Sequence, residues 1–261
     1  MNKKDIRKLA KNKNFISGIY NYCDRWCERC PLTSRCMNFA MSRAYSDDPE
    51  ASDITNDKFW QSLSKIFKMT REMLEESAQE MGIDLDSIDF EEASRDDAVD
   101  DKIVKNHVCC RAAQKYYKMV DEFFESEYIP ALHAVDKTDK ATASELPKLD
   151  RLERPANLDE MVEIIFWYHH FIYVKLMRAV RGTLGHAPQM IEDFPKDSDG
   201  SAKLALIAID RSMAAWGHLN DCFPAHRQQI FSIIQHLEGL RRRVENVFPQ
   251  ARNFVRPGFD E

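Results

Sequence analysis

The residues with the clearest potential for chemistry are four cysteines near the N-terminus: Cys23, Cys27, Cys30 and Cys36. Their spacing, C-x3-C-x2-C-x5-C, gathers four thiolates within about fourteen residues of chain. Thiolates at this density can bind one metal ion or one small cluster together. No signal peptide is visible, and in a reducing compartment clustered cysteines are ligands more often than disulfide partners. We therefore predict one metal centre that all four cysteines hold.

The way in which the chain presents these thiols follows from helical spacing. If residues 15–30 form a helix, its three cysteines occupy positions i, i+4 and i+7 and lie on one face. Pro31 would then end the helix, and the chain could turn back to deliver Cys36. Nearby cations would offset the negative charge of the thiolates: Arg25, Arg29 and Arg35.

The compact spacing also bears on the kind of metal centre. Tetrahedral zinc is usually bound by two C-x2-C-type hairpins that a longer loop separates. Short runs of x2 and x3 spacings are common in proteins that bind [4Fe–4S] clusters. We therefore predict a [4Fe–4S] cluster, with zinc as the alternative.

One segment resembles a known cluster-binding loop. Residues 27–36, CERCPLTSRC, resemble the last three ligands of the iron–sulfur loop in the endonuclease III and MutY glycosylase family, C-x2-C-x5-C, in which Pro often follows the middle cysteine. The family has six residues between its first and second ligands, whereas three separate Cys23 from Cys27 here. The resemblance covers residues 23–36 alone, and the helix-hairpin-helix of that family is not found. It implies a cluster type and does not imply glycosylase activity.

The rest of the sequence predicts an all-α protein, a helical bundle of about five long helices behind a small four-cysteine module. We place the module in residues 1–45 and the bundle in residues 46–261. A stretch rich in proline, residues 128–157, is the best place for a hinge. The five helices are expected at about residues 55–81, 94–126, 158–181, 201–221 and 224–248.

Apolar residues at helical spacing mark the faces that we expect to be buried. In the first long helix they are Trp60, Leu63, Phe67, Leu74, Ala78 and Met81. In the second they are Val99, Ile103, Cys110, Ala113, Tyr117, Val120 and Phe124.

A second candidate site consists of polar residues within apolar helices: His107, His170, Arg178 and Asp210. A histidine near a carboxylate can act as a general base or as a ligand, so these residues could form a buried catalytic site. In particular, we expect His170 and Asp210 to meet inside the bundle. The alternative is a set of satisfied core contacts without catalysis. No Glu-x-x-His pair, P-loop or other motif that identifies an enzyme class is present.

The charge distribution bears on partners. The net charge of −6 argues against a protein that simply coats nucleic acid. However, the first residues are strongly basic, with Lys3, Lys4, Arg7, Lys8, Lys11 and Lys13. Together with the arginines among the cysteines, these residues could bind nucleic acid or another acidic partner. Solvated surface charge is the alternative.

The sequence therefore predicts a cytoplasmic, metal-binding helical protein. No stretch approaches twenty consecutive apolar residues, so no membrane span is expected. The cluster would have a structural or partner-binding role. Two alternatives remain open, a zinc-binding helical protein and an enzyme with a buried His/Asp/Arg site.

Overall fold

The computed structural model describes residues 2–46, 50, 53–125, 158–184 and 196–260. Within these ranges the regular structure is entirely helical, which confirms the all-α prediction. The predicted hinge at residues 128–157 lies outside them. None of the described helices has the length and apolarity required to cross a lipid bilayer. The α-helices of the described residues are α1 (Lys3–Ala10), α2 (Met37–Ser46), α4 (Asp57–Glu80), α5 (Phe90–Asn106), α6 (Val108–Glu125), α8 (Leu158–Arg181), α9 (Asp197–Cys222) and α10 (Arg227–Val247).

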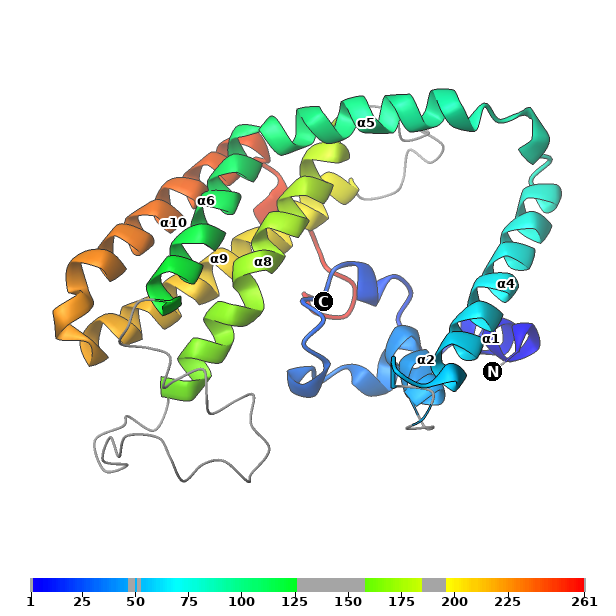
Figure 1. Cartoon of the computed structure of the whole chain (residues 1–261), viewed down its shortest axis with the longest axis horizontal. Coiled ribbons are helices and arrows are strands. Elements are labelled where there is room, and N and C mark those ends of the chain that lie inside the picture. The colour runs from blue at the N-terminus through cyan, green and yellow to red at the C-terminus, as the bar shows by residue number, and fades with distance from the viewer. Residues whose placement is uncertain (1, 47–49, 51–52, 126–157, 185–195, 261) are drawn as a thin grey trace. The chain divides into compact units, whose positions relative to one another are not determined.

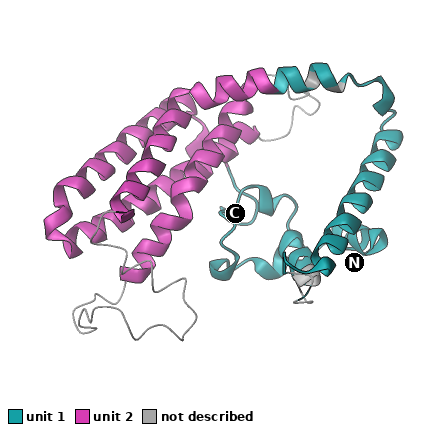
Figure 2. Cartoon of the chain, in the orientation of Figure 1, with its two compact units in different colours: residues 1–97, 255–261 teal, residues 98–254 magenta. Residues whose placement is uncertain are grey.

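The chain forms two compact units, which Figure 2 colours separately. Unit 1 combines residues 1–97 with residues 255–261, and unit 2 comprises residues 98–254. The predicted boundary after residue 45 does not coincide with this division, because α4 belongs to the N-terminal unit. Ion pairs join α4 to α1: Lys3 Nζ lies 2.5 Å from Glu72 Oε2, and Arg7 Nη2 lies 2.6 Å from Glu76 Oε2.

Unit 2 is a four-helix bundle of α6, α8, α9 and α10, in which each helix contacts two of the others (Figure 1). Neighbouring helices run antiparallel. A Cβ atom built on Gly182, just after α8, would lie 3.3 Å from the Cβ of Ser198 at the start of α9. The rings of Phe124, late in α6, and Phe166, early in α8, have centroids 4.6 Å apart. The bundle thus has four long helices instead of the predicted five, since α4 lies in unit 1.

Small residues explain why α9 is buried on nearly all sides. Residues with little or no side chain allow neighbouring helices to approach closely and still fill the space between them. In α9 the buried small residues are Ser198, Gly200, Ser201, Ala202, Ala205, Ala208, Ser212 and Ala215.

The helix predicted over residues 94–126 is instead two helices, α5 and α6, which are separated at His107. The Nδ1 atom of His107 accepts a hydrogen bond from the backbone N–H of Cys109 at 3.2 Å. This side chain therefore caps the N-terminus of α6, where the first N–H groups have no helical partner. The break changes which residues are buried: Val104 is inside, whereas Val99 and Ile103, predicted to be on the inner face, are exposed.

The predicted apolar face of α4 is only partly covered. Its Ala78 is buried, but Trp60, Phe67, Leu74 and Met81 are between 53% and 66% exposed. These four residues recur every seven positions, so they form one stripe along the helix. The prediction that this whole face belongs to a core is therefore wrong for the described part of the chain.

One hydrogen bond lies at the centre of the bundle. The Nε1–H group of Trp216 on α9 donates to Tyr116 Oη on α6 at 3.1 Å, and both side chains are fully buried. The ring of Phe123 packs edge-on against Trp216, with centroids 4.9 Å apart. Away from water, the indole N–H depends on the tyrosine hydroxyl as its acceptor.

We predict that Tyr116→Phe lowers the free energy of unfolding of unit 2 by about 1–3 kcal/mol, because it leaves the Trp216 N–H buried without an acceptor. Urea denaturation followed by circular dichroism measures this loss. The matched control is Tyr173→Phe, because no hydrogen bond joins the Tyr173 hydroxyl to any described residue. Equal losses in the two variants would contradict the prediction.

Candidate metal centre

The four cysteines lie in a loop between α1 and α2 that one backbone hydrogen bond closes. The N–H group of Ile16 donates to the carbonyl oxygen of Arg35 at 3.0 Å. Because Cys36 follows Arg35 directly, this bond brings the fourth cysteine back to the start of the loop. A loop whose ends meet in this way can pack on its own side chains and form a site.

The loop is built from short 3-10 turns, so the helix predicted over residues 15–30 is wrong. Gly18 and Arg25 both have a left-handed backbone, with φ of 71° and 59°, which a right-handed helix cannot contain. Between and after these two residues the chain makes three turns: η1 (Ile19–Asn21), η2 (Cys27–Arg29) and η3 (Thr33–Arg35).

Each turn is followed closely by a cysteine. The N–H of Cys30 donates to the carbonyl of Cys27 at 3.2 Å, so these two cysteines lie at the two ends of η2. The N–H of Cys36 similarly donates to the carbonyl of Thr33 at 3.2 Å and closes η3. The Cys23 thiol follows η1 and donates to the carbonyl of Tyr20 at 3.7 Å. The turns thus replace the predicted helix face in presenting the thiols.

All four cysteines line one small hollow that is partly open to solvent. Cys23, Cys27, Cys30 and Cys36 thus line the same hollow, and a metal centre shared by all four stays a prediction. All four are free thiols, and none forms a disulfide. The larger apolar side chains that complete the lining are Ile19, Trp26, Phe39 and Phe259.

The thiols influence one another electrostatically. Burial raises the pKa of Cys23 and of Cys27. For Cys27, the charges of the other three thiols and of Glu28 raise the pKa further. For Cys23, a hydrogen bond from the backbone of Arg25 acts in the opposite direction. Gathering four thiolates here therefore requires positive charge, which a metal centre would supply.

The backbone is strained beside the first cysteine. In the part of the chain that the structure describes, Arg25 is the one non-glycine residue with a positive φ. It lines the hollow, and the carboxylate of Asp24 accepts the N–H of Trp26 at 3.2 Å across the same turn. A left-handed residue other than glycine carries a free-energy cost, and such residues are concentrated at functional sites.

Two kinds of metal centre place different demands on the spacing of the thiols. No group of three or more His, Cys, Asp or Glu side chains among the described residues is arranged to hold a single ion. One zinc ion would need sulfurs about 3.7–4 Å apart, given Zn–S bonds near 2.3 Å. The sulfurs around a cubane cluster lie about 6–7 Å apart.

The second candidate site does not form, because His170 and Asp210 do not meet. Asp210 is 37% exposed and accepts hydrogen bonds from Arg252 at 2.6 Å and from Arg241 at 3.4 Å. His170 is exposed, and its ring centroid lies 5.8 Å from that of Tyr117. The expectation failed because the side of α9 that carries Asp210 faces α10 and the segment after α10, and does not face α8.

The other two members of that site have separate structural roles. Arg178 forms two hydrogen bonds with the carboxylate of Asp197, at 2.8 and 2.6 Å, and so joins the end of α8 to the start of α9. His107 caps α6. These residues have structural contacts, but Arg178 and Asp210 lie at the surface, so the alternative of satisfied core contacts is wrong for them as well.

The sequence analysis missed the apolar lining of the metal site. Phe39 lies in α2, shortly after the last cysteine. Phe259 is more than two hundred residues away from the cysteines in the sequence. No spacing rule links Phe259 to the cysteines, so only the folded structure identifies it.

Comparison with protein-family models, curated proteins and solved structures finds no significant match to this chain. The local resemblance of residues 23–36 to the glycosylase cluster loop thus remains a prediction.

Buried histidines generate a prediction about pH. Burial lowers the pKa of His107, His169 and His236. An unfolded chain binds protons at these residues near pH 6.5, whereas the folded protein binds them only at lower pH. Between those values the unfolded state holds more protons, so stability falls as the pH decreases.

We predict that the urea midpoint of unit 2 decreases between pH 7 and pH 5.5, and that His169→Gln reduces this decrease. The measurement uses a Cys30→Ala background, so that release of metal by acid does not contribute. A pH dependence that is identical in the two proteins would rule out His169 as one of its sources.

Proposed function

We propose that this protein binds a [4Fe–4S] cluster through Cys23, Cys27, Cys30 and Cys36, and that the cluster has a structural role in a basic module that binds nucleic acid. Four free thiols around one hollow carry the first half of this proposal. The second half depends on the charges of α1. Zinc at the same four cysteines is the alternative.

A shortage of apolar core in unit 1 supports a structural role. Among its described residues, only Ile19, Trp26 and Ala78 are buried apolar side chains, whereas unit 2 has buried residues on every helix of its bundle. A unit that buries so few apolar side chains needs stabilisation from another source, and a bound metal centre can supply it. The described cysteines form no disulfide, and a metal centre at the four thiols would link the loop in place of one.

When bound, a cluster would supply four iron–thiolate bonds across a loop with little core, and so contribute folding free energy to it. The chain itself contributes the closure of the loop through Ile16 and Arg35. The buried ring of Trp26, on which the guanidinium of Arg29 lies 4.1 Å from the centroid, excludes water from one side. Electron transfer is not required for this role.

We predict that the protein, purified anaerobically, contains about four iron atoms per chain and absorbs visible light as cluster proteins do. Cys30→Ala should lose the metal and loosen the loop, while most of the helical circular dichroism remains, because unit 2 has its own core. The control is Cys222→Ala, which changes a thiol of unit 2 and should retain the metal. One zinc ion per chain would support the alternative, and absence of any metal would overturn the proposal.

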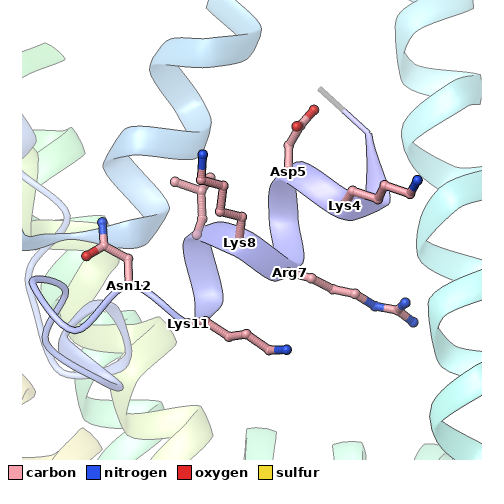
Figure 3. A pocket seen from close by; sticks show the side chains of 7 residues that line it. Lys4, Asp5, Arg7, Lys8, Lys11 and Asn12 are labelled. Carbon is pink, nitrogen blue, oxygen red and sulfur yellow. The ribbon is translucent and has the colours of Figure 1, made fainter.

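The basic face of α1 supports an anionic partner. Lys4, Lys8 and Lys11 occupy positions i, i+4 and i+7 and are exposed, and no ion pair joins them to a described residue. Figure 3 shows Lys4, Arg7 and Lys11 extending to one side of α1, around a shallow hollow that residues of this helix line. The adjacent Lys3 differs, because it pairs with Glu72.

Three exposed lysines along one short helix match the charge of a phosphate backbone better than that of a small ligand, since they surround no enclosed cavity. We expect contacts with phosphates and little recognition of base sequence. If these lysines are merely solvated surface charge, their removal should leave binding unchanged.

We predict that changing Lys4, Lys8 and Lys11 together to Gln weakens binding of a fluorescent DNA duplex and reduces the salt dependence of log K by up to about 0.9 for each lost phosphate contact. Anisotropy titrations at several salt concentrations measure both effects. A variant with Lys65, Lys68 and Lys118 changed to Gln removes the same charge elsewhere and should bind as the wild type does. Equal weakening in both variants would show that only net charge matters.

A further inference from the structure

The last described residues form a compact turn of their own. The backbone N–H of Arg256 donates to Asp260 Oδ2 at 2.9 Å, and its guanidinium Nη2 donates to Asp260 Oδ1 at 2.8 Å. The same guanidinium lies 5.0 Å from the centroid of the Phe259 ring. The two charged side chains are only 16% and 21% exposed. Arg256 thus fixes the turn and holds the aromatic ring in place.

Gly258 seats this turn against the cysteine loop. Its φ of 75° is left-handed, and a Cβ atom built on it would lie 2.6 Å from Ile16 Cδ1 and 3.4 Å from Ile19 Cδ1. Any other residue would carry the conformational cost of the left-handed backbone, and its Cβ would require Ile16 Cδ1 to move. Because Ile16 also closes the loop through its bond to Arg35, the turn packs on the residue that defines the loop.

The turn brings Phe259 to the hollow that the four cysteines line. The other aromatic residues of that lining, Tyr20, Trp26 and Phe39, come from the N-terminal part of the chain. Figure 2 shows residues 255–261 in the colour of unit 1, together with the loop. One end of the sequence therefore supplies the thiols, and the other supplies part of the surrounding wall.

We infer that the segment Arg256–Asp260 is a wall of the four-thiol site and limits access of solvent and reagents to the thiols. The part of this inference that concerns a bound cluster rests on the proposed function. The shielding of the thiols is independent of it. When this segment packs on the cysteine loop, it closes a long stretch of chain that contains all of unit 2. The chain entropy lost in that closure must be offset by the contacts of Gly258 and Phe259. Removing those contacts should therefore open the wall.

The test measures how fast a maleimide alkylates each cysteine, located by mass spectrometry, in the full-length protein as purified and after removal of metal with a chelator. In the metal-free protein, Phe259→Ala and Gly258→Val should each accelerate alkylation of Cys23, Cys27, Cys30 and Cys36 roughly tenfold, because the site opens more often. Phe259→Leu keeps an apolar side chain and should stay near the wild-type rate. Val255→Ala, at an exposed position just before the turn, is the matched control and should react as the wild type does.

The buried thiols of Cys109 and Cys110 report whether unit 2 stays folded, because they have no exposed surface. Faster alkylation of the four loop cysteines, with these two still protected, supports the wall. Unchanged rates in both Phe259→Ala and Gly258→Val overturn it. Faster alkylation in a protein that never contained metal would support the wall and overturn the cluster assignment alone. In metal-loaded protein, Phe259→Ala should also release metal to the chelator faster, and an unchanged release rate would overturn the claim that the wall protects a bound metal.

Discussion

The scarcity of apolar core in unit 1 is the constraint on which the rest of its structure depends. Unit 2 satisfies the usual requirement for stability, since its four helices bury apolar residues on their inner faces. Unit 1 cannot do so with Ile19, Trp26 and Ala78 alone. Its described order comes from local hydrogen bonds and from ion pairs between α1 and α4. This difference explains why candidate chemistry is concentrated in one unit.

The long helices could be predicted from sequence, because periodic apolar residues and flanking glycines or prolines are local signals. Helix α8 begins and ends where the sequence indicated. Periodicity identifies an apolar face but does not show whether another segment covers it, which is why the exposure of Trp60 and Phe67 on α4 was missed. Where a helix is apolar on nearly every side, as α9 is, the pattern also leaves its rotation undetermined, and Asp210 was therefore assigned to the wrong neighbours.

The cysteine site shows the same division between local and long-range information. Spacing was sufficient to identify the four thiols as one group. It was not sufficient to predict their backbone, because the left-handed conformation of Arg25 reflects contacts within the folded loop and not a preference of arginine. The contribution of Phe259 depends on a contact between the two ends of the sequence, which no local pattern encodes.

The division of unit 1 into residues 1–97 and 255–261 has a consequence for dissecting the protein. A fragment that stops at residue 97 would include every candidate ligand and all of α1, yet it would lack Gly258 and Phe259. The conventional route of cutting a multidomain protein once, between its domains, would thus yield an incomplete site. A minimal version of unit 1 must instead excise the interior of the chain and splice residue 97 to residue 255 through a linker. The four-helix bundle, in contrast, is continuous in sequence and can be removed as one piece.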